Sequence, residues 1–332
     1  MSKSKPCVSI GLPVYNGEKF IEEAINSLLN QTFTDLEIII CDNNSTDATE
    51  SICQEYALKD KRIRYYRNGS NIGAARNFNR TFKLAKGKYF KWAAHDDICD
   101  PTFLERCVEI LENKPEVVLC YPRTNIIDQQ GKTISYYQLE FKTNSLKAHE
   151  RFYDITRLHH RNYQIFGLIR TNILEKTPLI ASYAGSDRSL VAILTLYGQF
   201  FEIPEYLLQA RRHQKQSMEL LFNPHNKIEK ILRMHKYSEW FDPKNQGKIL
   251  LPNWRILQEY IWGIKKSPLV GVEQFLCFIQ LIKWMFSYWN GAKLIRDILI
   301  ATIQIIHIVY AKNILQPSTQ PEGSSQLSAE DV

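Results

Sequence analysis

Two adjacent aspartates, Asp96 and Asp97, are the side chains in this sequence with the clearest potential for chemistry. They follow an aromatic, strand-like run at 89–92 and precede Asp100-Pro101, which is typical of a helix start. A carboxylate pair at the end of a strand lies where α/β proteins bind their ligands. Because two neighbouring negative charges repel, the pair needs a divalent cation, an arginine or a shared proton to compensate it.

The elements that must position this pair alternate between strands and helices. Apolar or aromatic runs of strand length stand at 8–12, 36–41, 62–66 and 89–92, and helical spacing fills 18–30, 45–58 and 74–87. Such alternation predicts an α/β fold with a mostly parallel central sheet. Right-handed crossovers then place three polar loops, at 13–17, 42–45 and 94–97, along one edge of that sheet.

Beyond residue 100 the pattern is less regular. We expect a helix at 102–113, a strand at 117–121, a turn at 128–131 between two short strands, an irregular, acceptor-side region at 135–165, a helix at 188–197 and strands at 200–203 and 206–211. Residues 225–312 have a helical pattern, and residues 316–332, rich in Ser, Gln, Pro and Glu, are typical of a disordered tail.

Two residues on the predicted edge have both a structural and a functional interpretation. Asp42 ends an apolar strand and is either a turn aspartate or an acceptor for a nucleobase N–H. Tyr15 is either a packed aromatic residue or a surface on which a base stacks. Both alternatives remain open from the residues alone.

Three further residues are ambiguous in the same way. Arg76, in the helix after Asn71-Ile72-Gly73, is either solvated or directed at a diphosphate or the acidic pair. Asp187 is either a helix cap or a general base that takes a proton from an acceptor hydroxyl. His213, after two arginines, belongs to a basic surface strand or reaches a metal or phosphate.

The composition excludes several classes of protein. A chain of 332 residues with 44% hydrophobic content holds one large domain or two smaller ones. No G-x-G-x-x-G motif follows the first strand and no P-loop is present, which argues against a dinucleotide oxidoreductase and a P-loop NTPase. We expect no nucleic-acid partner.

The cysteines and the termini favour a cytoplasmic protein. The seven cysteines are odd in number and form no C-x-x-C pair, so we expect buried, reduced thiols. No signal peptide is visible, and the longest late uncharged run, 298–311, is shorter than the ~20 apolar residues of a membrane-spanning helix.

Six motifs in order carry a resemblance to a known family. They are Leu12-Pro13-Val14-Tyr15-Asn16, Asp42-Asn43-Asn44-Ser45-Thr46-Asp47, Asn71-Ile72-Gly73, Asp96-Asp97 with Pro101, Ser186-Asp187, and Arg212-His213-Gln214-Lys215-Gln216-Ser217. In this order and spacing they resemble the family 2 glycosyltransferases with the GT-A fold, over about residues 6–217.

The resemblance implies an inverting enzyme that moves a sugar from a nucleotide-diphosphate donor to a glycan or lipid-linked acceptor, as in surface polysaccharide synthesis. By position, it assigns the nucleobase to Pro13, Tyr15 and Asp42, and the ribose or metal to Asp96. It makes Asp97 a ligand of Mg²⁺ or Mn²⁺ and places His213 where it can join the metal or diphosphate. It makes Asp187 the general base.

The sequence departs from the family pattern at two positions. Ala94 stands where many members carry a further acid, and Ser186 replaces the glutamate that often precedes the base. We therefore favour Asp97 over Asp96 as the metal ligand. The alternatives are a nucleotidyltransferase, which would usually carry a glycine-rich loop after the first strand, and a non-catalytic nucleotide-sugar-binding module.

The last third of the chain is basic and rich in tryptophan. The formal net charge is +7, the basic excess lies after residue 210, and five of the six tryptophans follow it: Trp240, Trp254, Trp262, Trp284 and Trp289. Such helices either pack their aromatic residues on the catalytic domain or lie in a membrane interface. We expect a catalytic domain at 6–217, a helical subdomain at 218–315 with peripheral contact to the inner membrane face, and a disordered tail at 316–332.

Overall fold

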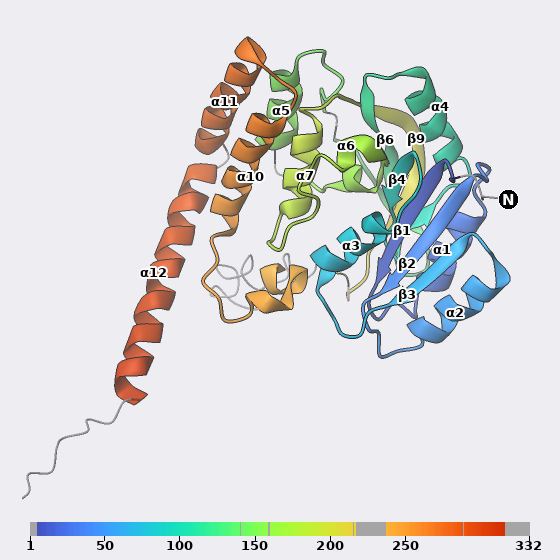
Figure 1. Ribbon diagram of the computed structural model, residues 1–332, viewed down its shortest axis with the longest axis horizontal. Helices are drawn as coiled ribbons and strands as arrows, with labels where there is room; N and C mark the ends of the chain where they lie inside the picture. Colours follow the sequence, from blue (N-terminus) through green and yellow to red (C-terminus); the bar gives the residue numbers. More distant parts are fainter. Residues whose placement is uncertain are drawn as a thin grey trace, which may run out of the picture.

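The computed structural model describes residues 5–139, 141–158, 160–214, 216, 237–287 and 289–315, with the backbone alone described for 307–315. Its described part contains one nine-stranded sheet in the order β3-β2-β1-β4-β8-β6-β9-β5, with β7 paired to β6. Figure 1 shows this sheet on one side of the molecule and a layer of C-terminal helices on the other.

The first four strands are parallel, as expected. They are β1 (Val8–Val14), β2 (Leu36–Asp42), β3 (Ile63–Arg67) and β4 (Tyr89–Trp92). Every residue of β1, β2 and β4 is buried, which matches their near-continuous apolar sequences. Val14 pairs with Asp42, so β1 and β2 end together, and β4 ends opposite Gly11 of β1. Because the strands are parallel, the loops that follow them lie at one edge of the sheet.

The remaining strands are mixed in direction. Strand β8 (Leu168–Arg170) lies antiparallel between β4 and β6 (Val117–Ile127), and β9 (Gln199–Arg211) runs parallel to β6. Short β5 (Ile98–Cys99) pairs with β9, and β7 (Thr133–Tyr137) forms the expected hairpin with β6.

The prediction of two strands at 200–203 and 206–211 is wrong, because β9 is continuous. Pro122 pairs with Ile203 and Arg123 with Tyr206, so residues 204–205 form a bulge. A proline and a charged residue inside a strand look like a turn in sequence, and only the pairing with β6 shows that the strand passes through them.

The helices of the first half match their predicted positions. They are α1 (Ile21–Leu29), α2 (Thr49–Lys59), α3 (Ala74–Lys83) and α4 (Phe103–Asn113). Later, α7 (Ser186–Leu194) overlaps the helix predicted at 188–197, and the short α6 (Thr171–Leu174) was not predicted. Helix α3 packs against β1, and α4 packs against β6.

The predicted irregular region at 135–165 contains helix α5 (Ala148–Arg157) and the 3₁₀ turn η1 (Tyr163–Phe166). The helix was missed because its buried face includes polar residues. Arg151 is buried and donates to the carbonyl oxygens of Thr195 and Ser145, and Asp154 is also buried. Polar residues on the inner face interrupt the apolar spacing by which a helix is recognised.

The C-terminal helices are packed on the catalytic domain. After η2 (Pro243–Asn245) come α10 (Pro252–Lys266), α11 (Gly271–Phe286) and α12 (Asn290–Leu315). Helix α10 packs on α7 and α11 on α5, and α12 extends past the rest of the molecule (Figure 1). The separate-subdomain prediction stays a prediction: its boundary at 217/218 and the tail at 316–332 lie outside the described residues.

One core joins the two parts. Tyr260 and Ile264 of α10 and Trp284 of α11 belong to the same buried cluster as Phe90 and Trp92 of β4. All seven cysteines are free, and all except the partly exposed Cys7 are buried, as the sequence predicts.

Candidate active site

The three polar loops predicted to converge do so. The backbone N–H of Asn16 donates to Ser45 Oγ at 2.9 Å, and the N–H of Thr46 donates to Asn16 Oδ1 at 2.9 Å. A Cβ atom added at Gly17 would lie 2.7 Å from the His95 ring, so only glycine lets the first loop lie this close to the loop of the acidic pair.

A buried arginine at the end of β9 holds the acidic pair. The backbone N–H of Arg211 donates to Asp97 Oδ1 at 2.9 Å, and its Nε donates to the carbonyl oxygen of Asp96 at 2.9 Å. Its guanidinium also donates to the carbonyl oxygens of Asp128 and Gln129 and to the carboxylate of Glu23. Arg211 is 2% exposed, and its contacts join the site loop, the β6–β7 turn and α1.

The two aspartates have different surroundings. Asp96 Oδ2 lies 2.9 Å from His213 Nε2. Burial acts to raise the pKa of Asp96, but the charge on His95 and the hydrogen bond with His213 outweigh it and lower the pKa. Asp97 lies among Ala24, Leu28 and Lys91, and burial, followed by the charge of Asp96, raises its pKa to about 8.

This arrangement divides the roles differently from the sequence-based expectation. We expected Asp97 and His213 to share a metal ion, whereas the carboxylate that lies against His213 belongs to Asp96. Among the described residues, no group of three or more His, Cys, Asp or Glu side chains could hold a metal by itself. A cation at Asp96 and His213 would therefore need further oxygen ligands, which the phosphates of a bound nucleotide can provide.

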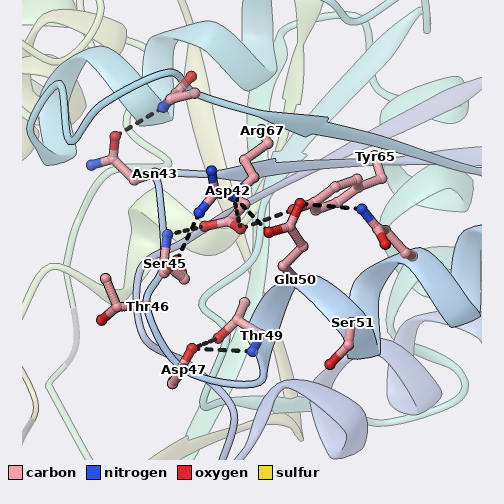
Figure 2. Close-up of polar contacts among 12 residues, drawn as sticks. Asp42, Asn43, Ser45, Thr46, Asp47, Thr49, Glu50, Ser51, Tyr65 and Arg67 are labelled. Carbon is pink, nitrogen blue, oxygen red and sulfur yellow. Dashed lines mark hydrogen bonds and ion pairs between the residues drawn. The ribbon is translucent and has the colours of Figure 1, made fainter.

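Asp42 is fully buried at the end of β2, and its carboxylate is already engaged (Figure 2). Its Oδ1 accepts from the Ser45 N–H at 2.8 Å, its Oδ2 accepts from the Tyr65 hydroxyl at 2.8 Å, and Arg67 Nε lies 3.7 Å from Oδ2. Arg67 also pairs with Glu50 at 3.0 Å. Asp42 therefore stabilises the turn that follows β2, as one of the two interpretations expected. Its contact with a nucleobase stays a prediction.

The other nucleotide candidates lie where the first strands end. Pro13 is buried at the end of β1, opposite Cys41 of β2, and Tyr15 is 44% exposed just beyond it. The phenol ring of Tyr15 is therefore open to a ligand at the edge that Asp42 also occupies.

A network of asparagines braces the loops beside this edge. Asn43 donates to Asn71 at 2.8 Å, and Asn68 donates to Asn43 at 2.8 Å and to Asn77 at 2.9 Å. Asn77 in turn donates to the carbonyl oxygen of Cys41 at 2.7 Å. The network explains why Asn71-Ile72-Gly73 precedes α3: these residues fix the start of the helix.

Arg76 lies in α3, as expected, and has a partner that the sequence did not indicate. Its guanidinium pairs with Asp242 at 3.0 Å, next to Gly73, where an added Cβ would lie 2.5 Å from the Phe241 carbonyl oxygen. In this structure Arg76 connects α3 to the C-terminal region. Its predicted contact with a diphosphate stays a prediction.

Asp187 lies in the first turn of α7, after Gly185, whose φ is 91°. Asn162 Nδ2 donates to Asp187 Oδ2 at 3.2 Å. Burial raises the pKa of Asp187, and the charge of Arg188 and the hydrogen bond from Asn162 only partly offset it. A raised pKa brings a carboxylate closer to the range in which general bases work.

Two consecutive residues connect Asp187 to the His213 side of the site. Asn162 contacts Asp187, and the Tyr163 hydroxyl accepts from the guanidinium of Arg212, the residue before His213. Arg211 and Asn162 had no role in the sequence-based prediction. The signal for Arg211 was a charged residue at the end of an apolar strand; nothing in the sequence indicated Asn162.

The match to known families decides the class. Residues 9–179 match the family described as glycosyl transferase family 2. The chain belongs to this family. Membership makes it a glycosyltransferase rather than a nucleotidyltransferase, the first alternative considered above.

Relatives agree with this assignment. A glycosyltransferase of Haemophilus influenzae is 29% identical over 69% of this chain and 72% of its own length. One from Methanocaldococcus jannaschii is 36% identical over 44% of this chain and half of its own. The chondroitin synthase of Escherichia coli is 34% identical over 44% of this chain, but the match covers 22% of that larger protein.

A solved structure confirms the fold. S. aureus TarS residues 1–349, in complex with UDP-GlcNAc, superimposes with a TM-score of 0.54 at 18% identity, over 93% of this chain and 92% of that one. The fold is therefore that of the GT-A glycosyltransferases, including the C-terminal helical region.

The central role of Arg211 leads to a stability prediction. We expect Arg211→Met to lower the free energy of unfolding by about 3–5 kcal/mol, because three backbone carbonyls lose a buried donor. The matched control is Arg106→Met, which removes an arginine that is 44% exposed and pairs with Glu109 and Glu205 at the surface. Urea unfolding should show a loss of about 1 kcal/mol or less for the control. Equal losses would contradict the role of Arg211.

Proposed function

We propose that this glycosyltransferase inverts the configuration of a sugar that it moves from a nucleotide-diphosphate donor to a hydroxyl of a glycan or lipid-linked acceptor. The observation that carries the proposal is the Asp96–His213 pair, which lies against the interlocked loops and is connected to Asp187 through residues 162–163. The relatives named chondroitin synthase and TarS support surface polysaccharide synthesis as the setting.

The acidic pair fits a divalent cation chemically. Asp96 and Asp97 are adjacent carboxylates, and their hard oxygen atoms are the ligands that Mg²⁺ and Mn²⁺ prefer. We propose that Asp96 and His213 hold Mg²⁺ or Mn²⁺, while Asp97 orients the loop through the Arg211 N–H. When bound, the cation would supply positive charge that offsets the charge on the departing nucleoside diphosphate.

The residues of the chain supply the other functions. We propose that Tyr15, Pro13 and Asp42 receive the nucleobase at the edge of β1 and β2. Arg76 could contact the diphosphate only by exchanging its ion pair with Asp242 for the phosphate oxygens. Asp187 then removes the proton from the acceptor hydroxyl as that oxygen attacks the anomeric carbon from the side opposite the leaving group, which inverts the centre. Asn162 holds the Asp187 carboxylate in place for this step.

The test of the function and of the cation site is donor hydrolysis. We expect release of nucleoside diphosphate from one of the UDP-, GDP- or dTDP-sugars in the presence of Mn²⁺. Asp96→Asn should lower this metal-dependent rate at least ~100-fold, because the oxygen facing His213 loses its charge. Asp97→Asn should lower it less, because an amide oxygen still accepts from Arg211.

The same experiment distinguishes the two metal assignments. A larger loss in Asp97→Asn than in Asp96→Asn, or a shift of the Mn²⁺ activation curve in Asp97→Asn alone, would restore the sequence-based assignment. Binding of a donor without any hydrolysis would favour a non-catalytic nucleotide-sugar-binding module instead.

The base assignment predicts a pH profile. Because a base works when deprotonated, kcat should fall as the pH drops through the pKa of Asp187, which is raised above the ~3.9 of a free aspartate. Asn162→Leu removes a hydrogen bond that lowers this pKa, so the acid limb should move to higher pH. The control is Asn125→Leu, an amide on β6. An acid limb that does not move would exclude Asn162 as a partner of the base.

We also propose peripheral contact of the C-terminal helices with an anionic membrane surface on the cytoplasmic side. Among the described residues, no helix is both long and apolar enough to cross a bilayer. Helices α11 and α12 instead expose large apolar side chains at helical spacing: Val272, Phe275, Ile282, Phe286, Ile295, Leu299, Ile303 and Ile306. Trp289, between the helices, is 82% exposed.

Charge and compartment support this proposal. Lys265 and Lys266 at the end of α10 and Lys283 of α11 are exposed, and the net charge of the chain is +7. Anionic headgroups complement such a surface, and tryptophan favours the interface between headgroups and acyl chains. Free, mostly buried cysteines suit the reducing cytoplasm.

Sedimentation with vesicles tests the membrane proposal. The full chain should bind vesicles of phosphatidylglycerol and phosphatidylcholine at low salt, and the triple variant Phe275→Ser, Phe286→Ser, Trp289→Ser should lose most binding, since each large apolar side chain contributes about 2 kcal/mol. The control is Leu58→Ser with Leu146→Ser, two residues that are each 88% exposed outside these helices. Absence of wild-type binding would reject the proposal.

A further inference from the structure

The loop at 175–185, which connects α6 to α7, is held at its centre by a side chain of α3. Asn79 forms two hydrogen bonds with the backbone of Ile180: its Nδ2 donates to the carbonyl oxygen at 2.8 Å, and its Oδ1 accepts from the N–H at 3.1 Å. Ile180 is only 5% exposed, so these two bonds satisfy backbone groups that water reaches poorly. The loop therefore depends on Asn79 for its position against α3.

The end of the same loop is held by the C-terminal segment 237–245. Ser238 is fully buried, and its Oγ accepts from the N–H of Ala184 at 3.0 Å. Asn245 Nδ2 donates to the carbonyl oxygen of Ser182 at 2.7 Å and to that of Ser238 at 2.9 Å. The amide of Asn245 thus joins the loop to the segment, and both partners are backbone carbonyls.

The segment 237–245 is itself fixed to the rest of the molecule. Tyr237 and Phe241 belong to the buried core cluster that also contains residues of β4. Asp242 is 4% exposed and pairs with Arg76 of α3 at 3.0 Å. Because the segment is anchored by core packing and by an ion pair, it gives the loop a firm support.

The position of this loop determines where the proposed base lies. Gly185 precedes α7 with a φ of 91°, and Asp187 is the second residue of the helix. No described side chain caps the N-terminus of α7, so the start of the helix is placed by the loop that leads into it. A displacement of about 1 Å in a catalytic group can lower a rate by about 100-fold.

We propose that Asn79, Ser238 and Asn245 are positioning residues for the transfer reaction. They fix the backbone of the loop at 175–185 and so direct the Asp187 carboxylate towards the oxygen from which it removes a proton. The inference rests on the proposed function, because it takes Asp187 as the base. It gives the segment 237–245 a role in the reaction that is separate from the proposed membrane contact of α11 and α12.

Donor hydrolysis by the full chain tests this role, with Mn²⁺ and the UDP-, GDP- or dTDP-sugar that the wild type hydrolyses. Water then takes the place of the acceptor hydroxyl and needs the same base. Asn245→Leu keeps a side chain of similar volume but removes both hydrogen bonds of the amide. We expect kcat to fall at least about tenfold and the donor KM to change less than about twofold, because the loop carries the base and not the donor contacts.

Asn79→Leu should have the same effect on kcat and KM, because it releases the centre of the loop. It provides a second variant if Asn245→Leu folds poorly. The matched control is Gln274→Met. Gln274 is a half-buried amide of α11 that donates to the carbonyl oxygen of Ile264 of α10 at 3.1 Å. The control loses the same type of bond in the C-terminal helices and should keep the wild-type kcat.

A double variant separates positioning of the base from a general effect on the fold. If Asn245 acts through Asp187, the variant with both Asn245→Leu and Asp187→Asn should hydrolyse the donor no more slowly than Asp187→Asn alone. Losses that multiply in the double variant would overturn the proposal. So would a wild-type kcat in both Asn245→Leu and Asn79→Leu, or an equal loss in Gln274→Met.

The single variant Asp187→Asn and the wild type distinguish the two levels of inference. If Asp187→Asn lowers kcat but the two loop variants do not, the positioning role is rejected and the proposed function stands. A wild-type rate in Asp187→Asn, or no hydrolysis by the wild type, rejects the proposed function and this inference with it.

Discussion

The candidate active site depends on one buried arginine, Arg211. Arg211 lies at the end of β9 with almost no exposed surface, and its guanidinium and backbone N–H contact the acidic pair, the β6–β7 turn and α1. A buried guanidinium is stable only when its donors are used, so these loops cannot move independently of one another. The same contacts turn the Asp97 carboxylate inward and leave the Asp96 carboxylate against His213.

Burial, more than charge pairing, sets the pKa of Asp187, the proposed base. Helix α10 packs on α7, and the surroundings this creates raise the pKa of Asp187. The C-terminal helices thus pack on the helix that carries the proposed base. Residues 162–163 connect the two sides, because Asn162 contacts Asp187 and Tyr163 contacts Arg212.

Much of the fold was predictable because its parallel strands are apolar and evenly separated by helices. The convergence of the three loops followed from that topology and was confirmed. The errors arose where a local pattern conflicts with tertiary contacts. The inner face of helix α5 includes buried Arg151 and Asp154, which interrupt the apolar spacing of a helix. Strand β9 continues through Pro204-Glu205 because β6 supplies the pairing partner.

The sequence by itself indicated the family, the first four strands with the helices between them, and the residue types available at the sheet edge, because motif order and apolar periodicity are local properties of the chain. Only the tertiary structure decided which aspartate meets His213, that Asp42 is enclosed by Tyr65 and Arg67, and that Arg76 pairs with Asp242. These outcomes depend on side chains between 23 and 166 positions apart in sequence. The packing of the fold and the pairing of buried charges decide which of these side chains meet, and no local sequence pattern indicates those contacts.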